Sequence, residues 1–253
     1  MCLVAFGLHP DDATRLVLVG NRDEFHQRAT APLAWWPDQP ILGGRDLQAG
    51  GTWFAIDRRG RFGALTNLRG AASPSQAPSR GQLIPAFLQS DESPPVFLRR
   101  LQAAAGQYAG FNLLLGDHSG TWIYSTGTPE QIRTLDPGCH AVSNGLPGSV
   151  WPKTALAVRR LQEHLSRPAP ESALANVLAD RAPAPDDQLP HTGLSIELER
   201  RLSPAFIVQP DYGTRSTTVC VLHQRGGGWV EETTFSAGGE VQQRVRQTLE
   251  ATD

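Results

Sequence analysis

Residues 2–24 read CLVAFGLHPDDATRLVLVGNRDE, and they contain the first two predicted strands of the chain. Two apolar runs, Leu3–Leu8 and Leu16–Gly20, flank a turn segment that holds one proline and two aspartates. Proline and aspartate are typical of tight turns, so the pattern predicts a β-hairpin. Each run is apolar at consecutive positions rather than at alternate ones, which indicates strands that are buried on both faces.

The register of this hairpin brings two features of the chain together. If Leu8 pairs with Leu16 across the turn, Cys2 lies opposite Arg22 in the next strand. A slip in register would change which way side chains face, but it would leave Cys2 beside the same polar cluster. That cluster, Asn21-Arg22-Asp23-Glu24, ends the second apolar run abruptly.

Composition limits the classes of function that fit. The chain has 253 residues, 40% of them hydrophobic, which is enough for a single domain over residues 1–253. The formal net charge of -2 argues against a nucleic-acid partner. No apolar stretch approaches the roughly 20 residues of a transmembrane helix, and the N-terminus lacks the pattern of a signal peptide. Three widely spaced cysteines, Cys2, Cys139 and Cys220, favour a reducing compartment, so we expect a cytoplasmic protein.

The rest of the chain alternates between groups of strands and groups of helices. Further strands are predicted over Pro40–Gly43, Thr52–Asp57, Phe62–Asn67, Phe111–Gly116, Thr121–Tyr124, Ala141–Ser143, Ala205–Val208, Thr217–His223 and Gly228–Phe235. Helices are predicted over Gly81–Gln89, Val96–Ala105, Thr154–Leu165, Glu171–Leu178 and Glu240–Glu250. Ala71–Arg80 and Arg181–Gly193 read as loops, and the first of them is placed to cover a site. This order predicts an α+β fold, which two antiparallel sheets covered by helix layers would satisfy.

The N-terminal cysteine carries the chemistry. Removal of Met1 would expose Cys2, whose α-amine has an ordinary pKa of about 7.7–8.0 and can act as a base beside its own thiol. Arg22 alongside would favour the reactive thiolate, and Asp23 would orient the amine. Glu24 and Asn21 would bind the polar part of a substrate. The plainer alternative is a small residue at the start of a strand beside a solvated turn or ion-pair network; the register favours a site because it brings both features to one place.

An ordered set of motifs runs from Cys2 to about Phe235. It comprises Met1-Cys2-Leu3, Asn21-Arg22-Asp23-Glu24, Gly43-Gly44-Arg45-Asp46, Gly51-Thr52-Trp53, Thr66-Asn67, Ser143-Asn144-Gly145 and Gly213-Thr214-Arg215-Ser216-Thr217. The set resembles the NRDE family, the homologues of transport and Golgi organization protein 2. That resemblance implies an αββα fold like that of the N-terminal-nucleophile (Ntn) hydrolases. Roles in haem or lipid handling have been proposed for the family.

A looser resemblance is to the cysteine Ntn amidases that cleave bile-acid conjugates and penicillin V. It implies that Cys2 is the nucleophile, that Arg22 and Asp23 flank it, and that Asn144 stabilises the oxyanion. It also implies that Arg215 completes the catalytic set, with Asn67 as a second polar donor. Arg22 and Asp23 are adjacent here, unlike their counterparts in the amidases, and adjacent residues of a strand face opposite ways.

Two functions follow, with a purely structural module as a weaker third. The first is an amide hydrolase or acyl transferase that acts through Cys2 on a small non-peptide substrate and requires no cofactor. The second is a non-catalytic carrier or trafficking protein that binds an amphipathic ligand, haem or an acyl-CoA or other lipid, in the same cleft, with Trp53 in its wall. The scattered histidines lack zinc-site spacing, so no metal site is expected, although one histidine remains available as a haem ligand.

Overall fold

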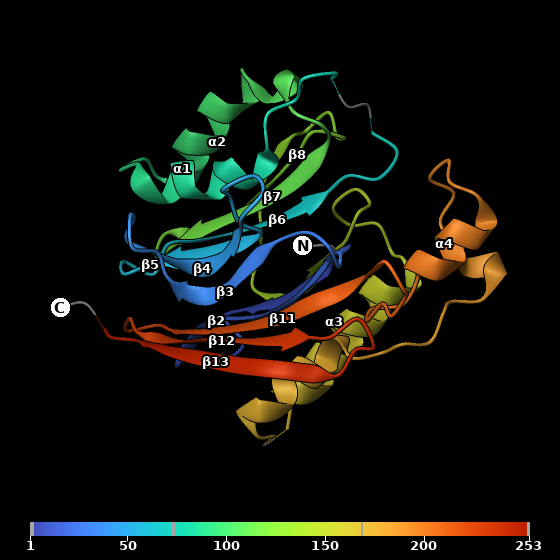
Figure 1. Ribbon diagram of the computed structural model, residues 1–253. Coiled ribbons are helices and arrows are strands. Elements are labelled where there is room, and N and C mark those ends of the chain that lie inside the picture. Colours follow the sequence, from blue (N-terminus) through green and yellow to red (C-terminus); the bar gives the residue numbers. More distant parts are fainter. Residues whose placement is uncertain (1–2, 72–73, 168, 252–253) are drawn as a thin grey trace.

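The computed structural model describes residues 3–71, 74–167 and 169–251, and two antiparallel sheets stacked face to face form its centre (Figure 1). The first sheet has the strand order β10 (Gly138–Val142), β1 (Leu3–Leu8), β2 (Thr14–Phe25), β11 (Tyr212–His223), β12 (Gly228–Phe235) and β13 (Val241–Leu249). The second runs in chain order through β3 (Thr30–Trp35), β4 (Ile41–Asp46), β5 (Phe54–Asp57), β6 (Phe62–Asn67), β7 (Phe111–Asp117), β8 (Gly120–Ser125) and β9 (Ile132–Thr134).

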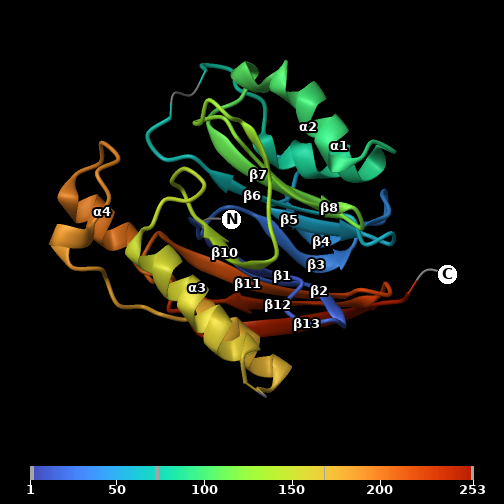
Figure 2. The same cartoon turned by 180° about the vertical axis from the view of Figure 1, so that it is seen from behind.

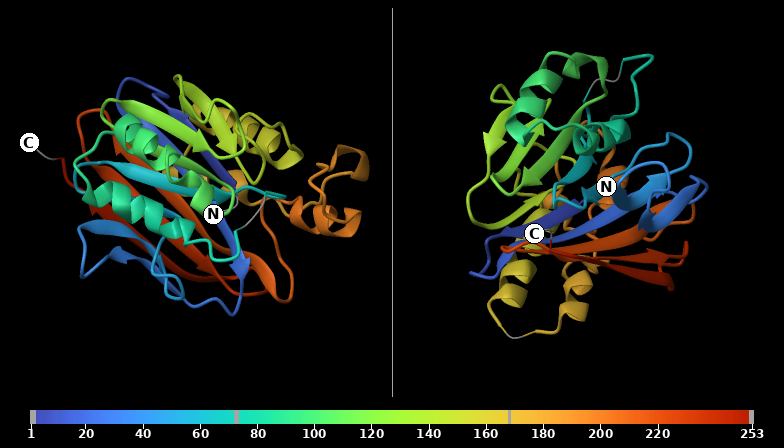
Figure 3. Two further views of the ribbon diagram at one scale, coloured as in Figure 1. Left: turned by 90° about the horizontal axis from the view of Figure 1, so that it is seen from above. Right: turned by 90° about the vertical axis from the view of Figure 1, so that its left-hand side faces the viewer.

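Helices cover the outer face of each sheet, as Figures 1 and 2 show. The second sheet is covered by α1 (Leu83–Gln89) and α2 (Pro94–Gln102), and the first by α3 (Pro152–Leu165) and the 3-10 helix Glu171–Leu178. The short helix α4 (Ile196–Leu202) projects beside the sheets. Figure 3 shows the green helices α1 and α2 lying over the strands in the view from above, and the stacking of helices and sheets in the view from the side. The α+β class with two antiparallel sheets between helix layers, predicted from the sequence, is confirmed.

The N-terminal hairpin has the predicted register. Leu8 pairs with Leu16 and Leu3 pairs with Asn21, and every residue of β1 is buried. On its other side β1 pairs with β10, so that Val4 lies between Gly20 and Val142. Both strands are therefore interior strands, as their continuous apolar sequence indicates.

Alternation along β2 explains why an unbroken apolar run was needed. Leu16 and Leu18 point into the core between the two sheets, whereas Val17 and Val19 point into the core beneath α3. A third cluster fills the space between the second sheet and α1 and α2. Because both faces of β2 are covered, every position of this run must be apolar.

The four polar residues 21–24 do not end the strand, contrary to the sequence prediction. β2 continues to Phe25 because β11 pairs with it along its length, and Asn21, Arg22 and Asp23 are buried within the sheet. A strand flanked by partners on both sides can carry polar residues into the interior where their hydrogen bonds are satisfied there.

Several other expectations were wrong. Glu240–Glu250 is not a helix: its residues form β13, where pairing with β12 overrides the helix preference of its glutamines and arginines. Ala205–Val208 is irregular chain, buried at residues 205–207 and exposed at Val208, with a single bridge from Val208 to Gly213. The strands β3 and β9 and the helix α4 were not predicted. Within the described residues, no helix is long and apolar enough to cross a membrane.

Candidate functional site

A cavity of about 360 Å³ opens beside the polar end of β2, and we call it the polar cavity. Arg22, Asp23 and Glu24 form one wall, and Trp53 and Asn67 of the predicted site also line it. A further wall comes from residues 77–81, which belong largely to the loop that the sequence placed over a site. Five of the nine predicted site residues therefore line one cavity.

Arg22 is the least satisfied charged group in this cavity. The residue is only 3% exposed, and its guanidinium stacks on Trp53 with the central carbon 4.3 Å from the ring centroid. Its Nη1 is buried and has no hydrogen-bond partner among the described residues. Burial lowers the pKa of Arg22, and the carboxylates of Glu24 and Asp46 act in the opposite direction. An arginine remains protonated under such shifts, so a buried positive charge faces the cavity.

Asp23 also lines the cavity although it is adjacent to Arg22 on the strand. The reason is a bulge in β11: Arg22 pairs with Ser216 and Asp23 with Thr214, so that Arg215 is the extra residue. Bulges twist a strand locally and redirect its side chains. Asp23 accepts a hydrogen bond of 2.7 Å from Thr214 Oγ1.

Arg215 itself does not line the cavity. Its Nη1 donates to the carbonyl oxygens of Phe25, His26 and Arg28, which fixes the turn that follows β2. Its positive charge contributes to the lowered pKa of Arg22. The structure thus gives Arg215 a position from which it supports the wall of the cavity.

Asn21 faces away from the polar cavity and ties together distant parts of the chain. Its Nδ2 donates to the carbonyl oxygens of Leu178 and Ala205, and its Oδ1 accepts from Thr217 Oγ1. These three bonds satisfy the fully buried amide and anchor the outer layer to the sheet.

The acidic groups at the rim of the cavity are already paired. Asp46 accepts two hydrogen bonds from Arg28, at 2.9 and 2.7 Å, and a third from the backbone N–H of Gln48. Burial alone would raise the pKa of Asp46, but the bonds from Arg28 and from backbone N–H groups outweigh it, and the pKa is lowered. Glu24 Oε1 accepts from its neighbour Phe25, and Oε2 lies 3.7 Å from Arg28 Nε.

Glu232 is a buried carboxyl near Arg22 that the sequence prediction missed. It is 2% exposed, and it links the sheets because it accepts a 2.8 Å hydrogen bond from the backbone N–H of Leu33. Burial raises its pKa, and the charge of Arg22 acts against that shift. The alternation of the strand could have predicted this buried carboxyl. Glu232 lies two residues after Val230, so both side chains are on the face of β12 that points to the core, and β12 was predicted correctly.

Asn144 lies on the other side of the start of β1. Its Nδ2 donates to the carbonyl oxygen of Asn67 at 3.0 Å, and its side chain lines a separate cavity of about 550 Å³. Val4 pairs with Gly20 in β2 and with Val142 in β10. Arg22 lies two residues after Gly20 within β2, and Asn144 lies two residues after Val142, just past the end of β10. They therefore flank the beginning of β1. Cys2 lies outside the described residues.

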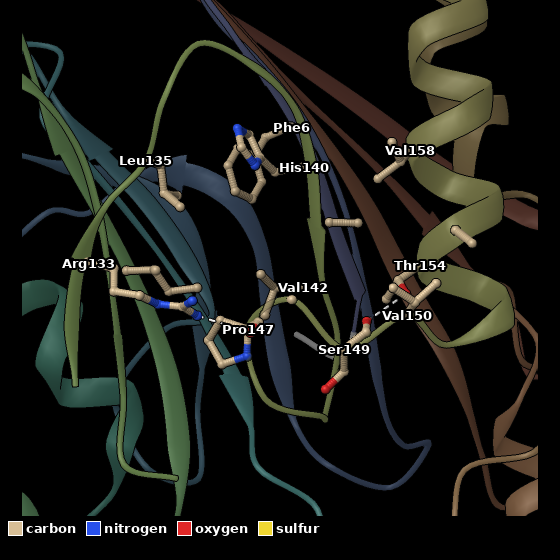
Figure 4. A pocket seen from close by; sticks show the side chains of 14 residues that line it. Phe6, Arg133, Leu135, His140, Val142, Pro147, Ser149, Val150, Thr154 and Val158 are labelled. Carbon is tan, nitrogen blue, oxygen red and sulfur yellow. Dashed lines mark hydrogen bonds between the residues drawn. The ribbon is translucent and has the colours of Figure 1, made fainter. Parts of the chain in front are cut away.

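A third cavity, of about 530 Å³, lies between α3, β10 and the segment around β9 (Figure 4). Its wall is largely apolar, with Phe6, Leu135, Val142 and Val158 around it and Arg133 at one side. Among the described residues, no group of three or more histidine, cysteine or acidic side chains is placed to hold a metal ion.

Comparison with known proteins identifies relatives along almost the whole chain. The family model described as Transport and Golgi organisation 2 matches residues 1–237. The Transport and Golgi organization 2 homolog of Mus musculus is 31% identical over 249 residues, covering 89% of this chain and 90% of the relative. The Bos taurus homolog is 32% identical over 248 residues, with the same two coverages.

Solved structures with a similar arrangement share little sequence with this chain. A mutant of the conjugated bile acid hydrolase from Clostridium perfringens has a TM-score of 0.49 and 9% identity, covering 100% of this chain and 97% of that one. An N-acylethanolamine-hydrolyzing acid amidase ortholog of Caenorhabditis elegans has a TM-score of 0.44 and 11% identity, covering 86% and 92%. By its sequence matches over nearly the full length, this chain belongs to the Transport and Golgi organisation 2 family.

Proposed function

We propose that this chain is an N-terminal-cysteine amide hydrolase or acyl transferase that acts on a small non-peptide substrate in the polar cavity. The observation that carries the proposal is the arrangement around the start of β1. Arg22 on one neighbouring strand and Asn144 beyond the other flank this strand start, and Arg22 is a buried cation without a hydrogen-bond partner at Nη1 among the described residues. A thiol at this place would be favoured as the thiolate by that charge.

The chemistry needs only groups that the chain itself supplies. After loss of Met1, the free α-amine of Cys2 takes the thiol proton, and the thiolate attacks the carbonyl carbon of the substrate. The C–N bond then breaks, the leaving amine takes the proton, and a thioester on Cys2 remains. Water releases the acid in a hydrolase, whereas an acceptor amine or alcohol takes the acyl group in a transferase.

The second candidate is a non-catalytic carrier for an amphipathic ligand such as haem or an acyl-CoA. The apolar cavity of about 530 Å³ favours it, because cavities of this size and lining are typical of small-molecule sites. This candidate requires the polar group of the ligand to be held by Arg133, which lines that cavity, and it needs no free N-terminus.

The decisive experiment begins with the intact mass of the protein from its native host. A mass without Met1 supports the hydrolase, and the protein should then be tested on a panel of amides and thioesters. Cys2→Ala should abolish turnover, whereas Cys139→Ala should leave it unchanged because Cys139 pairs with Gly7, toward the other end of β1, and does not line the polar cavity. Retention of Met1, or turnover that survives in Cys2→Ala, would exclude this mechanism.

A further inference from the structure

We propose that the polar cavity recognises its ligand through a carboxylate group, which binds the guanidinium of Arg22. The inference rests on the proposed function in taking the polar cavity as the substrate site. It goes further because it assigns a chemical group to the ligand and a recognition role to Arg22.

The motif residues around Arg22 hold its guanidinium in a fixed place. Trp53 lies beneath it, and Gly44 leaves the room that the indole ring occupies: a Cβ at Gly44 would lie 2.3 Å from a ring carbon. Gly51 similarly lets the covering loop approach, because a Cβ there would lie 2.4 Å from the backbone of Gly81. Thr52 N–H donates to the Gly81 carbonyl at 3.0 Å and joins the two segments. The cavity is thus lined by an arginine that is held on one face by Trp53 and whose buried Nη1 has no hydrogen-bond partner among the described residues.

Among the described residues, the acidic groups near Arg22 form no ion pair with it, and the nearby Glu232 is bonded to the backbone N–H of Leu33. Asp46 is bonded to Arg28, Glu24 is bonded to a backbone N–H, and Asp23 accepts from Thr214. Within the described part of the chain, no carboxylate oxygen lies within 4.0 Å of the Arg22 guanidinium, as an ion pair would require. A buried charge without a partner is costly, so the cavity favours an anion that enters it.

A carboxylate fits this site better than a phosphate does. A guanidinium presents parallel N–H groups that match two oxygens in one plane, and stacking on Trp53 occupies its face rather than those N–H groups. Of the described arginines that line this cavity, Arg22 alone has a buried nitrogen without a partner, which matches a single negative charge rather than the larger charge of a phosphate. Asn67, exposed at the rim, offers an additional amide donor. The volume of about 360 Å³ suits a small molecule.

The test uses simple probes and the full chain with Cys2→Ala, in which no turnover interferes. Phenylacetate, phenylacetamide and phenyl phosphate should be titrated in a calorimeter at low ionic strength. Charge-assisted hydrogen bonds predict that phenylacetate binds at least about tenfold more tightly than its neutral amide. Equal affinities, or no binding of phenylacetate at millimolar concentration, would overturn the proposal. Stronger binding of phenyl phosphate than of phenylacetate would overturn the choice of carboxylate.

Two arginine variants identify the residue responsible. Arg22→Gln should abolish the preference for phenylacetate over phenylacetamide. Arg58→Gln is the matched control, because Arg58 also stacks on a tryptophan, at 4.2 Å from the Trp35 ring centroid, and does not line the polar cavity. The control should retain the full preference. A preference that persists in Arg22→Gln would contradict the assignment.

Stability and turnover separate this inference from its alternatives. If Arg22 serves ligand recognition, Arg22→Gln without ligand should be at least as stable as the parent, because an uncompensated buried charge has been removed. A large loss of stability would instead indicate a structural arginine. Carboxylate binding without hydrolysis of any amide would refute the proposed function and leave this inference standing. Hydrolysis of amides with no preference for acidic substrates would support the proposed function and refute this inference.

Discussion

Replacement of Gly44 by alanine tests whether Gly44 packs against the Trp53 ring beneath Arg22 as closely as the structure indicates. The new Cβ would lie 2.3 and 2.4 Å from two carbons of the Trp53 ring and 3.3 Å from Glu232 Oε2. Carbon atoms in contact stay about 3.5–4.0 Å apart, so the ring would have to move by roughly 1 Å or more. Trp53 is rigid and only 4% exposed, and it packs in the core between the sheets, so this movement disturbs its neighbours.

The expected cost combines two opposing effects. Overpacking of a well-packed core typically costs about 1–3 kcal/mol. Replacing glycine by alanine at an unstrained position stabilises by about 0.4–1 kcal/mol through the unfolded state. We therefore expect Gly44→Ala to lower the free energy of unfolding by about 1–2 kcal/mol. Displacement of the ring also removes the support of Arg22, so the affinity for phenylacetate should fall.

Urea unfolding followed by circular dichroism measures the loss without relying on the fluorescence of Trp53. Gly106→Ala is the matched control, since a Cβ at Gly106 would meet nothing within 4 Å. The double variant Gly44→Ala/Trp53→Leu should recover part of the loss, because the smaller side chain removes the clash. If Gly44→Ala proves as stable as Gly106→Ala, the tight contact between Gly44 and Trp53 does not exist and the reasoning fails.

Three further predictions concern buried ionisable groups. Burial raises the pKa of Glu232 above the ordinary 4.5, so the folded protein loses stability as the pH rises from about 4.5 through the folded-state pKa. Glu232→Gln should flatten that part of a plot of urea midpoint against pH. An unchanged slope would contradict this prediction. Burial raises the pKa of Cys220 to about 12, so iodoacetamide in mild alkali should label the half-buried Cys139 before Cys220. Peptide masses that show equal labelling rates for the two cysteines would count against this reasoning. Arg69→Met should lower the free energy of unfolding in urea by about 3–5 kcal/mol, because it removes the ion-pair partner of Glu199 at 2.5 Å. The Glu199 side chain is 3% exposed, so its charge would then be buried without a partner. The double variant Arg69→Met/Glu199→Gln should recover most of that loss.

The features that the sequence predicts well are local. The β1–β2 register follows from a short turn between two apolar runs, and burial of both faces makes any slip costly. The helical nature of α3 follows from its own periodicity. β13 was mistaken because its glutamines and arginines favour a helix in isolation, whereas the exposed edge of β12 supplies the pairing that decides the outcome. No window of sequence around β13 contains that edge.

In the candidate site, too, the features that depend on neighbouring residues could be predicted, and those that depend on distant segments could not. Arg22, Asp23 and Glu24 could be placed together because they are consecutive and follow a predictable hairpin. The role of Asn21 could not be predicted, because its partners Leu178 and Ala205 lie more than 150 residues away in sequence. The bulge that lets Asp23 reach the cavity depends on how two strands nearly 200 residues apart align.

The short polar run in the middle of an interior strand thus has different partners at successive positions. Asn21 faces the outer layer and holds it to the sheet, while Arg22 faces the space between the sheets and stacks on Trp53. Only Arg22 is left with a buried nitrogen that bonds to none of the described residues, and Asn21 has every polar atom engaged. Structure alone would favour an apolar residue at position 22, since an apolar core residue of similar volume is often at least as stable as a buried charge. The anion site proposed above would account for an arginine at this place, because a bound anion compensates the buried charge.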